Sequence, residues 1–189
     1  FFFKQKTAYE IVDCDWSSDV CSSDLETEAV ILPTLSGPHV PRFVARGDIT
    51  RTPYLVTEFV PGESLENELR RRRPPPLEAA AIGALVADAL QSVHRQQVVH
   101  LDIKPDNIIR SPDGKVSIID FGMAHHSRYP DLLAEEKRYA AGSAPYVSPE
   151  QVLGDRTDPR SDIFALGVVL YEMATGRLPD RKSTRLNSS

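Results

Sequence analysis

The sequence predicts one α+β domain whose second half is mainly helical. Three observations support this fold class. Short apolar runs at 40–45 and 54–60 are typical of strands, residues 77–97 repeat apolar side chains at helical spacing, and residues 107–120 have the pattern of a β-hairpin. A length of 189 residues allows one domain of this kind.

The two ends of the chain read as translated sequencing-library adapter. Residues 180–189 match one strand of such an oligonucleotide, residues 15–24 match its complementary strand, and residues 4–11 match another adapter segment. We therefore expect residues 1–25 to be an artefact and disordered, expect 180–189 to be an artefact too, and leave both out of fold reasoning. Both cysteines and the single tryptophan lie in the first stretch, so the rest of the chain has no thiol chemistry.

Composition and charge exclude several classes of protein. The formal net charge is −5, which gives no support to nucleic-acid binding as the main activity. No apolar run approaches the roughly 18 residues that suggest a membrane span, so we expect no membrane segment in this chain. Two cysteines cannot form a disulfide framework in a chain this long.

The first elements follow from local pattern. Residues 26–35 carry apolar positions at helical spacing and form the last part of a helix. The run at 54–60 ends in a Pro-Gly connector, and residues 64–71 can form a short polar helix. The arginines at 70–73 could be a basic docking patch, but we favour a solvated helix end, because runs of charge usually face water.

Two longer helices are predicted downstream. Residues 77–97 place one apolar face on a core, and residues 162–175 are apolar on nearly every side, which is typical of a buried helix. Gly176 and Pro179 fit the end of the second helix. The apolar face of the first consists of Ile82, Leu85, Val86, Ala89, Leu90 and Val93.

The hairpin pattern at 107–120 is the most informative. A Ser-Pro-Asp-Gly turn at 111–114 separates two apolar runs and suits a type I turn. Closing the hairpin brings Asn107 and Asp120, at its two open ends, close together in space. Two oxygen donors of this kind suit a hard cation such as Mg²⁺ that shares its other positions with water and phosphate. A lone Asn and Asp at strand ends are more often ordinary turn residues.

Several motifs in a fixed order resemble those of a bacterial, eukaryotic-like Ser/Thr protein kinase. They are HLDIKPDN at 100–107, DFG at 120–122 and SPE at 148–150. The stretches 142–151 and 161–167 resemble the bacterial branch in particular. The resemblance implies a two-lobed, kinase-like fold, here truncated, with a remnant of the N-lobe and hinge at 26–60 and a partial C-lobe at 61–179.

The resemblance also implies the chemistry. Asp102 would accept or orient the proton of the substrate hydroxyl, and Lys104 would neutralise charge on the transferring phosphate. Asn107 and Asp120 would hold Mg²⁺ or Mn²⁺ ions that bridge the phosphates of ATP. The expected reaction is phosphorylation of Ser or Thr on a protein substrate in the cytoplasm, whatever membrane anchor the parent protein has.

Residues 54–60 look like the hinge between the lobes. By resemblance, the backbone of Glu58 and Val60 would bind adenine, Thr57 would be the gatekeeper, and Ile109 would lie beneath the ring. Backbone recognition leaves little trace in side chains, so these four residues are expected from alignment with the family pattern alone.

The other expected site residues have structural or regulatory roles. Glu28 aligns with the helix glutamate that pairs with the ATP-binding lysine, and Asp162 resembles the aspartate that braces the catalytic loop. Ser143 takes the place of the usual threonine in the substrate-docking loop. The partner of Glu150 is expected in helices after residue 179, which we expect to be missing. His100 and Phe121 are expected in the internal hydrophobic stack of the family, together with Leu32.

Leu101 departs from the pattern of kinases that are regulated through their activation loop. Those kinases have arginine before the catalytic aspartate, and the arginine binds a phosphorylated loop in a charge-assisted pair. Leucine cannot do so, and no threonine occurs between Asp120 and Glu150. Our hypothesis is that the parent enzyme does not need this phosphorylation switch.

A second departure concerns ATP. The Gly-rich phosphate loop and the strand lysine should precede Glu28, where the chain instead carries the adapter-like sequence. We therefore expect the 189-residue chain to be inactive. Two alternatives stay open: a pseudokinase scaffold, and a small-molecule phosphotransferase on a kinase-like fold, although Lys104, the 142–150 loop and Asp162 argue against the latter.

Overall fold

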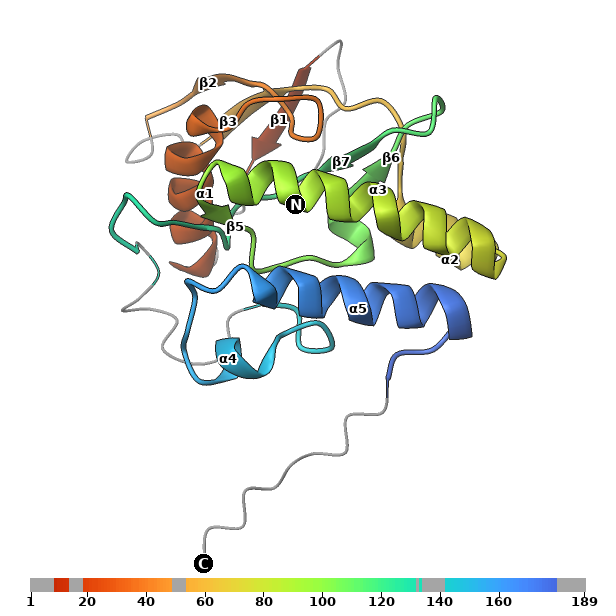
Figure 1. The fold of residues 1–189 in the computed structure, drawn as a ribbon. Coiled ribbons are helices and arrows are strands. Elements are labelled where there is room, and N and C mark those ends of the chain that lie inside the picture. The colour runs from red at the N-terminus through yellow and green to blue at the C-terminus, as the bar shows by residue number, and fades with distance from the viewer. Residues whose placement is uncertain (1–8, 14–18, 49–53, 132, 134–141, 180–189) are drawn as a thin grey trace, which may run out of the picture.

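The structure is a computed structural model that describes residues 9–13, 19–48, 54–131, 133 and 142–179. A three-stranded sheet with one helix forms the N-terminal part, and the helices α3 and α5 run side by side through the C-terminal part (Figure 1). Two small sheets lie between these parts. The fold class expected from the sequence, α+β with a mainly helical second half, is confirmed.

The N-terminal sheet has the strand order β1-β3-β2, and both pairs are antiparallel. Its strands are β1 (Tyr9–Asp13), β2 (Phe43–Arg46) and β3 (Tyr54–Glu58). Helix α1 (Asp19–Ile31) continues into the 3-10 turn η1 (Leu32–Thr34). The strands expected at 40–45 and 54–60 are therefore present, with shifted ends.

Two stretches within 1–25 differ from the expectation of disorder, because 9–13 form β1 and α1 begins at Asp19. The sequence of β1, YEIVD, contains three strong strand formers. An edge of β3 without a neighbour offers backbone donors and acceptors to any extended segment, whatever the origin of its sequence. The remainder of 1–25, and all of 180–189, lie outside the described residues.

The central elements surround the catalytic motifs. Helix α2 (Leu65–Arg71) is capped by Ser64, whose hydroxyl accepts the N–H of Asn67, and α3 (Pro76–Arg95) follows. The expected hairpin is confirmed as β6 (Ile108–Arg110) and β7 (Val116–Ile118), with β4 (Glu63–Ser64) on the other edge of β6. Strand β5 (Val98–Val99) pairs with β8 (His125–His126), and η2 (Pro105–Asn107) precedes β6.

The last elements are the short α4 (Pro149–Val152) and α5 (Arg160–Thr175). Ser148 caps α4 in a reciprocal capping box with Gln151. Helix α5 ends at Gly176, whose φ of 71° is the left-handed conformation that glycine adopts at low cost. The sequence had indicated this end of the helix.

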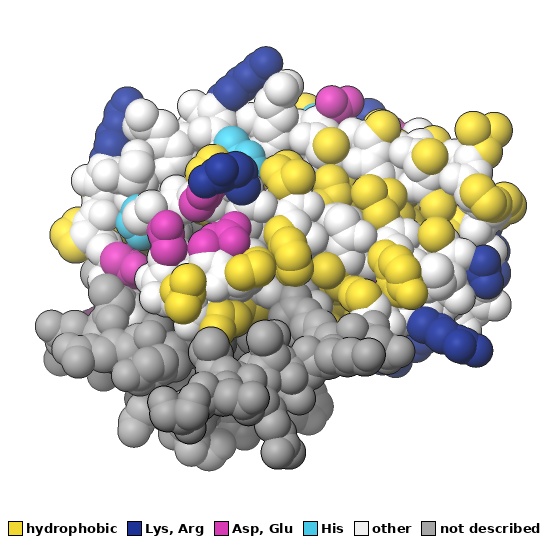
Figure 2. All heavy atoms as spheres, turned by 60° about the horizontal axis from the view of Figure 1, so that its bottom comes forward, with side chains coloured by type: hydrophobic (Ala, Val, Ile, Leu, Met, Phe, Trp, Pro, Cys, Tyr) yellow, Lys and Arg dark blue, Asp and Glu magenta, His cyan; other side chains and the backbone are white. Residues whose placement is uncertain are grey.

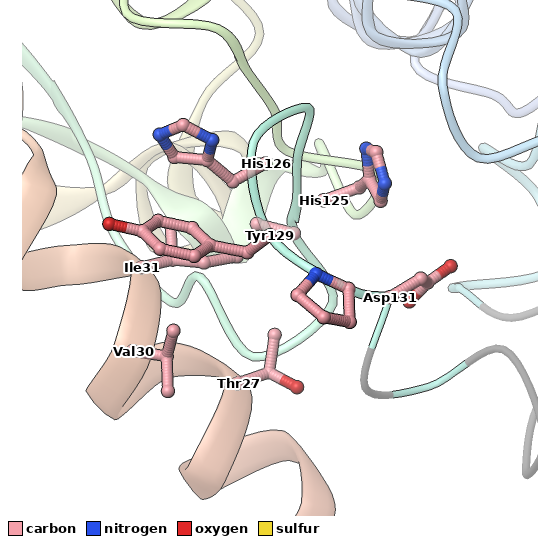
Figure 3. Close-up of a pocket in the computed structure, with 9 residues that line it drawn as sticks. Thr27, Val30, Ile31, His125, His126, Tyr129 and Asp131 are labelled. Atoms are coloured by element: carbon pink, nitrogen blue, oxygen red, sulfur yellow. The ribbon is translucent and has the colours of Figure 1, made fainter.

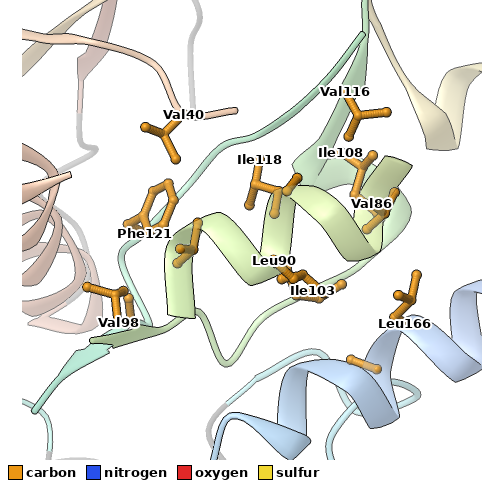
Figure 4. Close-up of a cluster of buried hydrophobic side chains, with 14 of the residues drawn as sticks. Val40, Val86, Leu90, Val98, Ile103, Ile108, Val116, Ile118, Phe121 and Leu166 are labelled. Atoms are coloured by element: carbon orange, nitrogen blue, oxygen red, sulfur yellow. The ribbon is translucent and has the colours of Figure 1, made fainter. Parts of the chain in front are cut away.

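One hydrophobic core joins the elements, and Figure 4 shows its side chains between α3, the hairpin and α5. Val86, Leu90 and Val93 of α3 are fully buried in it. Leu85 is an exception to the expected apolar face, since it is 37% exposed. Helix α3 is also long and apolar enough to cross a membrane, so the expectation that no segment qualifies was too strong; its buried face packs in this core.

Helix α5 is not buried on every side. Ile163 and Tyr171 are 50% and 46% exposed, whereas Val169 and Met173 on the opposite side are fully buried. Figure 2, which brings the α4–α5 side forward, shows hydrophobic side chains gathered on this face. The expectation of a helix buried on nearly every side is therefore wrong, because a sequence pattern does not show which neighbours a helix has.

The arginines at 70–73 lie on the surface, as the solvated interpretation predicted. Arg70 pairs with Glu66 at 2.8 Å, and Arg71 pairs with Glu63. Arg72 donates to both Glu68 and Glu78, and its hydrogen bond lowers the pKa of Glu78 to about 2. These carboxylates neutralise the run, which makes it a poor docking patch for an acidic partner.

Candidate active site

The catalytic loop between β5 and β6 is built around the carboxylate of Asp102. Asp102 is 8% exposed. Its Oδ2 accepts Lys104 Nζ at 2.7 Å and Asn107 Nδ2 at 3.2 Å, and its Oδ1 accepts the backbone N–H of Ser143 at 2.9 Å. Lys104 Nζ also donates to Ser143 Oγ at 3.0 Å. The structure therefore brings together four residues that span 41 positions of sequence.

Opposing influences act on the protonation of Asp102. Burial by itself would raise the pKa of this carboxyl group, but the hydrogen bond and charge of Lys104, with help from the Ser143 N–H, outweigh it and lower the pKa. Asp102 is thus an anion at neutral pH. A buried carboxylate held in this form can accept a further hydrogen bond from a hydroxyl group.

Asp162, in the first turn of α5, holds the backbone of the same loop. Its side chain is fully buried and accepts the N–H groups of His100 and Leu101, each at 2.8 Å. His94 Nε2 lies 2.8 Å from its Oδ2. The loop needs this support because Leu101 has a φ of 65°, a conformation that is strained for leucine.

The hairpin places Asn107 and Asp120 at its open end. The N–H of Ile119 donates to the carbonyl of Asn107 at 3.0 Å, which continues the ladder beyond the strands and sets Asp120 beside Asn107. Asn107 Nδ2 donates to the carbonyl of Asp102, so its amide oxygen faces away from this bond. Asp120 is exposed, and its φ of 66° lies in the left-handed region.

The internal stack is present around the DFG sequence. Leu32, His100 and Phe121 are all fully buried, and the His100 and Phe121 rings meet edge to face with centroids 4.9 Å apart. Glu28 of α1 is buried and accepts the backbone N–H of Phe121 at 3.1 Å. In this chain Glu28 therefore fixes the backbone next to Asp120.

The expected hinge, residues 54–60, consists of β3 and the two residues that follow it. Thr57 is buried, as suits a residue at the back of a site. The N–H of Glu58 donates to Arg42 O at 2.9 Å, so adenine would have to use its carbonyl. A hollow of about 430 Å³ lies beside this segment, and both Glu58 and Val60 line it, but Ile109, Asn107 and Asp120 do not. This hollow therefore meets the expected nucleotide position at the hinge residues and does not extend to the expected metal ligands.

The expected substrate-docking loop at 142–150 packs against the loop that carries Asp102. Gln151 Nε2 donates to Leu101 O at 2.9 Å, and a Cβ at Gly142 would lie 3.2 Å from the same oxygen. Glu150 accepts a hydrogen bond from Ser161 Oγ at 3.0 Å. These contacts fix Ser143 beside Lys104.

Some residues at the site escaped sequence reasoning. His94 supports Asp162 from the last turn of α3, and Tyr146 donates to Glu172 at 2.7 Å. Burial first, and then Glu172, raise the pKa of Tyr146. The buried Arg156 binds Asp131 and Met123 O. No pattern in the sequence distinguishes Arg156 from the exposed Arg160 nearby, since both lie in one polar stretch.

Comparison with known proteins identifies the family. Residues 4–188 match the family model that is described as "Protein kinase domain". A probable serine/threonine-protein kinase of Clostridium perfringens is 39% identical over 80% of this chain, and one of Corynebacterium efficiens is 35% identical over 93%. Serine/threonine-protein kinase PknL of Mycobacterium tuberculosis is 38% identical over 71%.

These relatives are much longer, and the chain spans only 22%, 27% and 33% of their respective lengths. The matches nevertheless cover most of this chain, including the catalytic loop and the helices around it. The chain belongs to the protein kinase family, on the side of the bacterial Ser/Thr kinases.

Proposed function

We propose that this chain is part of an enzyme that transfers a phosphoryl group from ATP to serine or threonine in protein substrates. The observation that carries the proposal is the arrangement of Asp102, Lys104 and Ser143 beside the pair Asn107 and Asp120. Phosphoryl transfer depends mainly on positioning and on neutralisation of charge, and this arrangement supplies both.

Asp102 is proposed as the residue that receives the substrate hydroxyl. Three donors reach its two oxygens, and a carboxylate has about four acceptor positions. One position is therefore open to the incoming hydroxyl. Because Lys104 keeps the carboxyl ionised, it can orient this hydroxyl and take its proton as the new bond to phosphorus forms.

Lys104 is proposed to act between Asp102 and the transferring phosphate. Its ammonium group has three donors, of which two reach Asp102 and Ser143. The third can reach an oxygen of the phosphoryl group. The contact with Ser143 ties this cation to the docking loop, so that substrate binding and charge neutralisation occur at one place.

The residues present fit a divalent cation. Asn107 has committed its Nδ2 to Asp102, which leaves the amide oxygen as the donor atom that can turn to a metal, and Asp120 adds a carboxylate. Two oxygen ligands suit Mg²⁺ or Mn²⁺ that completes its shell with water and phosphate. Bound Mg-ATP would supply the phosphoryl group and the positive charge that offsets its negative oxygens.

We further propose that the 189-residue chain does not itself transfer phosphate. The strand beside β3, β1, has the sequence YEIVD and contains no lysine or arginine to hold the phosphates. The test is a transfer assay with radiolabelled ATP, Mg²⁺ and casein, in which this chain should not exceed its Asp102→Asn variant. Transfer above that control would refute the proposal.

The activity of the parent requires a separate assay. With the upstream coding sequence restored, Asp102→Asn should lower the rate by about 10²-fold or more. A parent that binds Mg-ATP but transfers nothing with Asp102 intact would instead be a scaffold. A Gly-rich loop with a strand lysine in the upstream coding sequence would exclude this second candidate, and their absence would support it.

Regulation is proposed to be independent of activation-loop phosphorylation. Leu101 is buried and cannot bind a phosphate. Phosphatase treatment of the parent should leave its kinase activity unchanged. Loss of activity after treatment would contradict the hypothesis.

ATP is the proposed donor, so the reaction would occur in the cytoplasm.

A further inference from the structure

Arg156, in the loop between α4 and α5, binds two separate points of the segment that follows Asp120. Its Nε donates to Asp131 Oδ2 at 2.7 Å, and its Nη2 donates to Met123 O at 3.0 Å. The Arg156 and Asp131 side chains are 7% and 19% exposed. Arg156 is the only buried arginine or lysine in the part of the chain that the structure describes. A cation at this depth is stable only when it is well paired.

Met123, whose carbonyl accepts from Arg156, lies within one turn of Asp120. Phe121 O accepts the N–H of Ala124 at 3.0 Å, so a single turn joins Asp120 to Met123. The second point is near the far end of the segment, where Asp131 also accepts the N–H of Leu133 at 3.1 Å. Arg156 therefore joins the two ends of the stretch 123–131 through one planar guanidinium group.

Backbone contacts also hold this stretch, since the N–H of Ser127 donates to Gln97 O at 3.0 Å. Strand β8 pairs with β5 over two residues only. On the α1 side, a cavity of about 10 Å³ separates Thr27 and Val30 from His126 and Asp131 (Figure 3). Thr27 Oγ1 faces buried surroundings and has no hydrogen-bond partner among the described residues. The ion pair of Asp131 is formed with Arg156, which lies in the loop between α4 and α5.

We infer that Arg156 is a positioning residue of the kinase site, which holds the segment after Asp120 through Met123 O and the permanent carboxylate of Asp131. The role rests on the proposed function. The planar guanidinium reaches a carboxylate and a carbonyl at once, which an ammonium group cannot do with the same geometry. Asp131 thereby supplies the negative charge that a phosphate would otherwise bring, in a chain whose Leu101 cannot bind phosphate.

The test compares Arg156→Met, Arg156→Lys and Asp131→Asn with the control Arg160→Met, which removes an exposed arginine at the start of α5. Amide hydrogen exchange of the 189-residue chain is followed in peptides over 121–131 and over 82–93 of α3. We expect exchange at 121–131 to be at least tenfold faster in Arg156→Met, with α3 little changed. Arg156→Lys should restore part of the protection, and Arg160→Met should equal wild type.

A second readout is the affinity for Mn²⁺ in the presence of ADP, measured by electron paramagnetic resonance. Arg156→Met should weaken it at least fivefold. The inference is overturned if exchange in 121–131 and α3 rises equally while the Mn²⁺ affinity is unchanged, because Arg156 would then be a structural residue only. If Arg156→Met does not fold, Asp131→Asn and Arg156→Lys decide by the same criteria.

Two outcomes separate this inference from the proposed function. If wild type binds no Mn²⁺ with ADP, the proposed metal site fails, and the exchange data alone decide whether Arg156 holds the segment. Phosphatase treatment of the chain should not change exchange at 121–131. An increase to the level of Arg156→Met would overturn the inference, since a phosphate and not Asp131 would then order the segment.

Discussion

Asp162 and Asp120 belong to two regions of the site that are built in opposite ways. Asp162 is fully buried, accepts two backbone N–H groups and contacts His94. Asp120 is exposed and lies at the end of a hairpin in a left-handed conformation. The first carboxylate shapes the protein, and the second is presented to solvent, where a cation can reach it. Stability and proposed ligand binding are thus divided between two residues of the same type.

Replacement of Asp162 is expected to cause the largest loss of stability. Replacement by alanine leaves the N–H groups of His100 and Leu101 buried without their acceptor, so we expect a loss of about 3–5 kcal/mol in the free energy of unfolding. Urea denaturation measures it. Asp155→Ala is the control, because the Asp155 carboxylate accepts a backbone N–H of Thr157 at the surface and should matter by less than about 1 kcal/mol. Equal losses would contradict the contrast.

The next largest loss of stability is expected when Lys104 is replaced. Its ion pair with Asp102 can be compared with an exposed pair of the same type. Lys115 and Asp113 have the same spacing and the same 2.7 Å distance, but they are exposed. Lys104→Met should lower the free energy of unfolding by about 1–2 kcal/mol at pH 7, whereas Lys115→Met should change it far less, because solvent screens the exposed pair.

The cost of Lys104→Met should also depend on pH. Lys104 contributes to the lowered pKa of Asp102 in the folded state, so its stabilisation is complete above the ordinary value of 3.8. It is lost as the pH falls through the lowered folded pKa. Urea denaturation at pH 7 and pH 2.5 should therefore show a smaller difference between variant and wild type at the lower pH. A difference that does not depend on pH would contradict this assignment.

In the 142–150 loop, the contrast between a buried and an exposed side chain can be tested at Tyr146. Tyr146→Phe removes the hydrogen bond to Glu172 and should cost about 1 kcal/mol, whereas Tyr171→Phe, on the exposed side of α5, should cost less than about 0.5. Because the pKa of Tyr146 is raised in the folded state, its contribution is complete below about pH 10 and is lost at higher pH. Chemical denaturation at pH 8 and pH 11 measures both effects. A cost that persists undiminished at pH 11 would argue against the assignment.

The smallest effect on stability is expected at Asp120. Asp120→Asn changes an exposed side chain and should alter the free energy of unfolding by less than about 0.5 kcal/mol. The affinity of this variant for Mn²⁺ in the presence of ADP should nevertheless be at least tenfold lower than that of wild type, because a neutral amide is a weaker ligand for a hard cation. A large loss of stability with unchanged Mn²⁺ binding would reverse the roles that we give to Asp120 and Asp162.

Local pattern determined much of this protein. The turn at 111–114 and its flanking apolar runs predicted the hairpin, the apolar spacing predicted α3, and Gly176 predicted the end of α5. The motif series also indicated Asp102, Lys104, Asn107 and Asp120, because a catalytic loop keeps its residue types at short, fixed spacing. These features depend on neighbours along the chain, which is the information that a sequence contains.

Only the tertiary structure decided the rest. It paired β1 with β3 through backbone groups that any extended segment offers, and it left one side of α5 exposed. It buried Arg156 between Asp131 and Met123, while the nearby Arg160 remained at the surface. Burial and pairing of this kind depend on residues that are distant along the chain, so the same residue type in the same stretch can have opposite energetic roles.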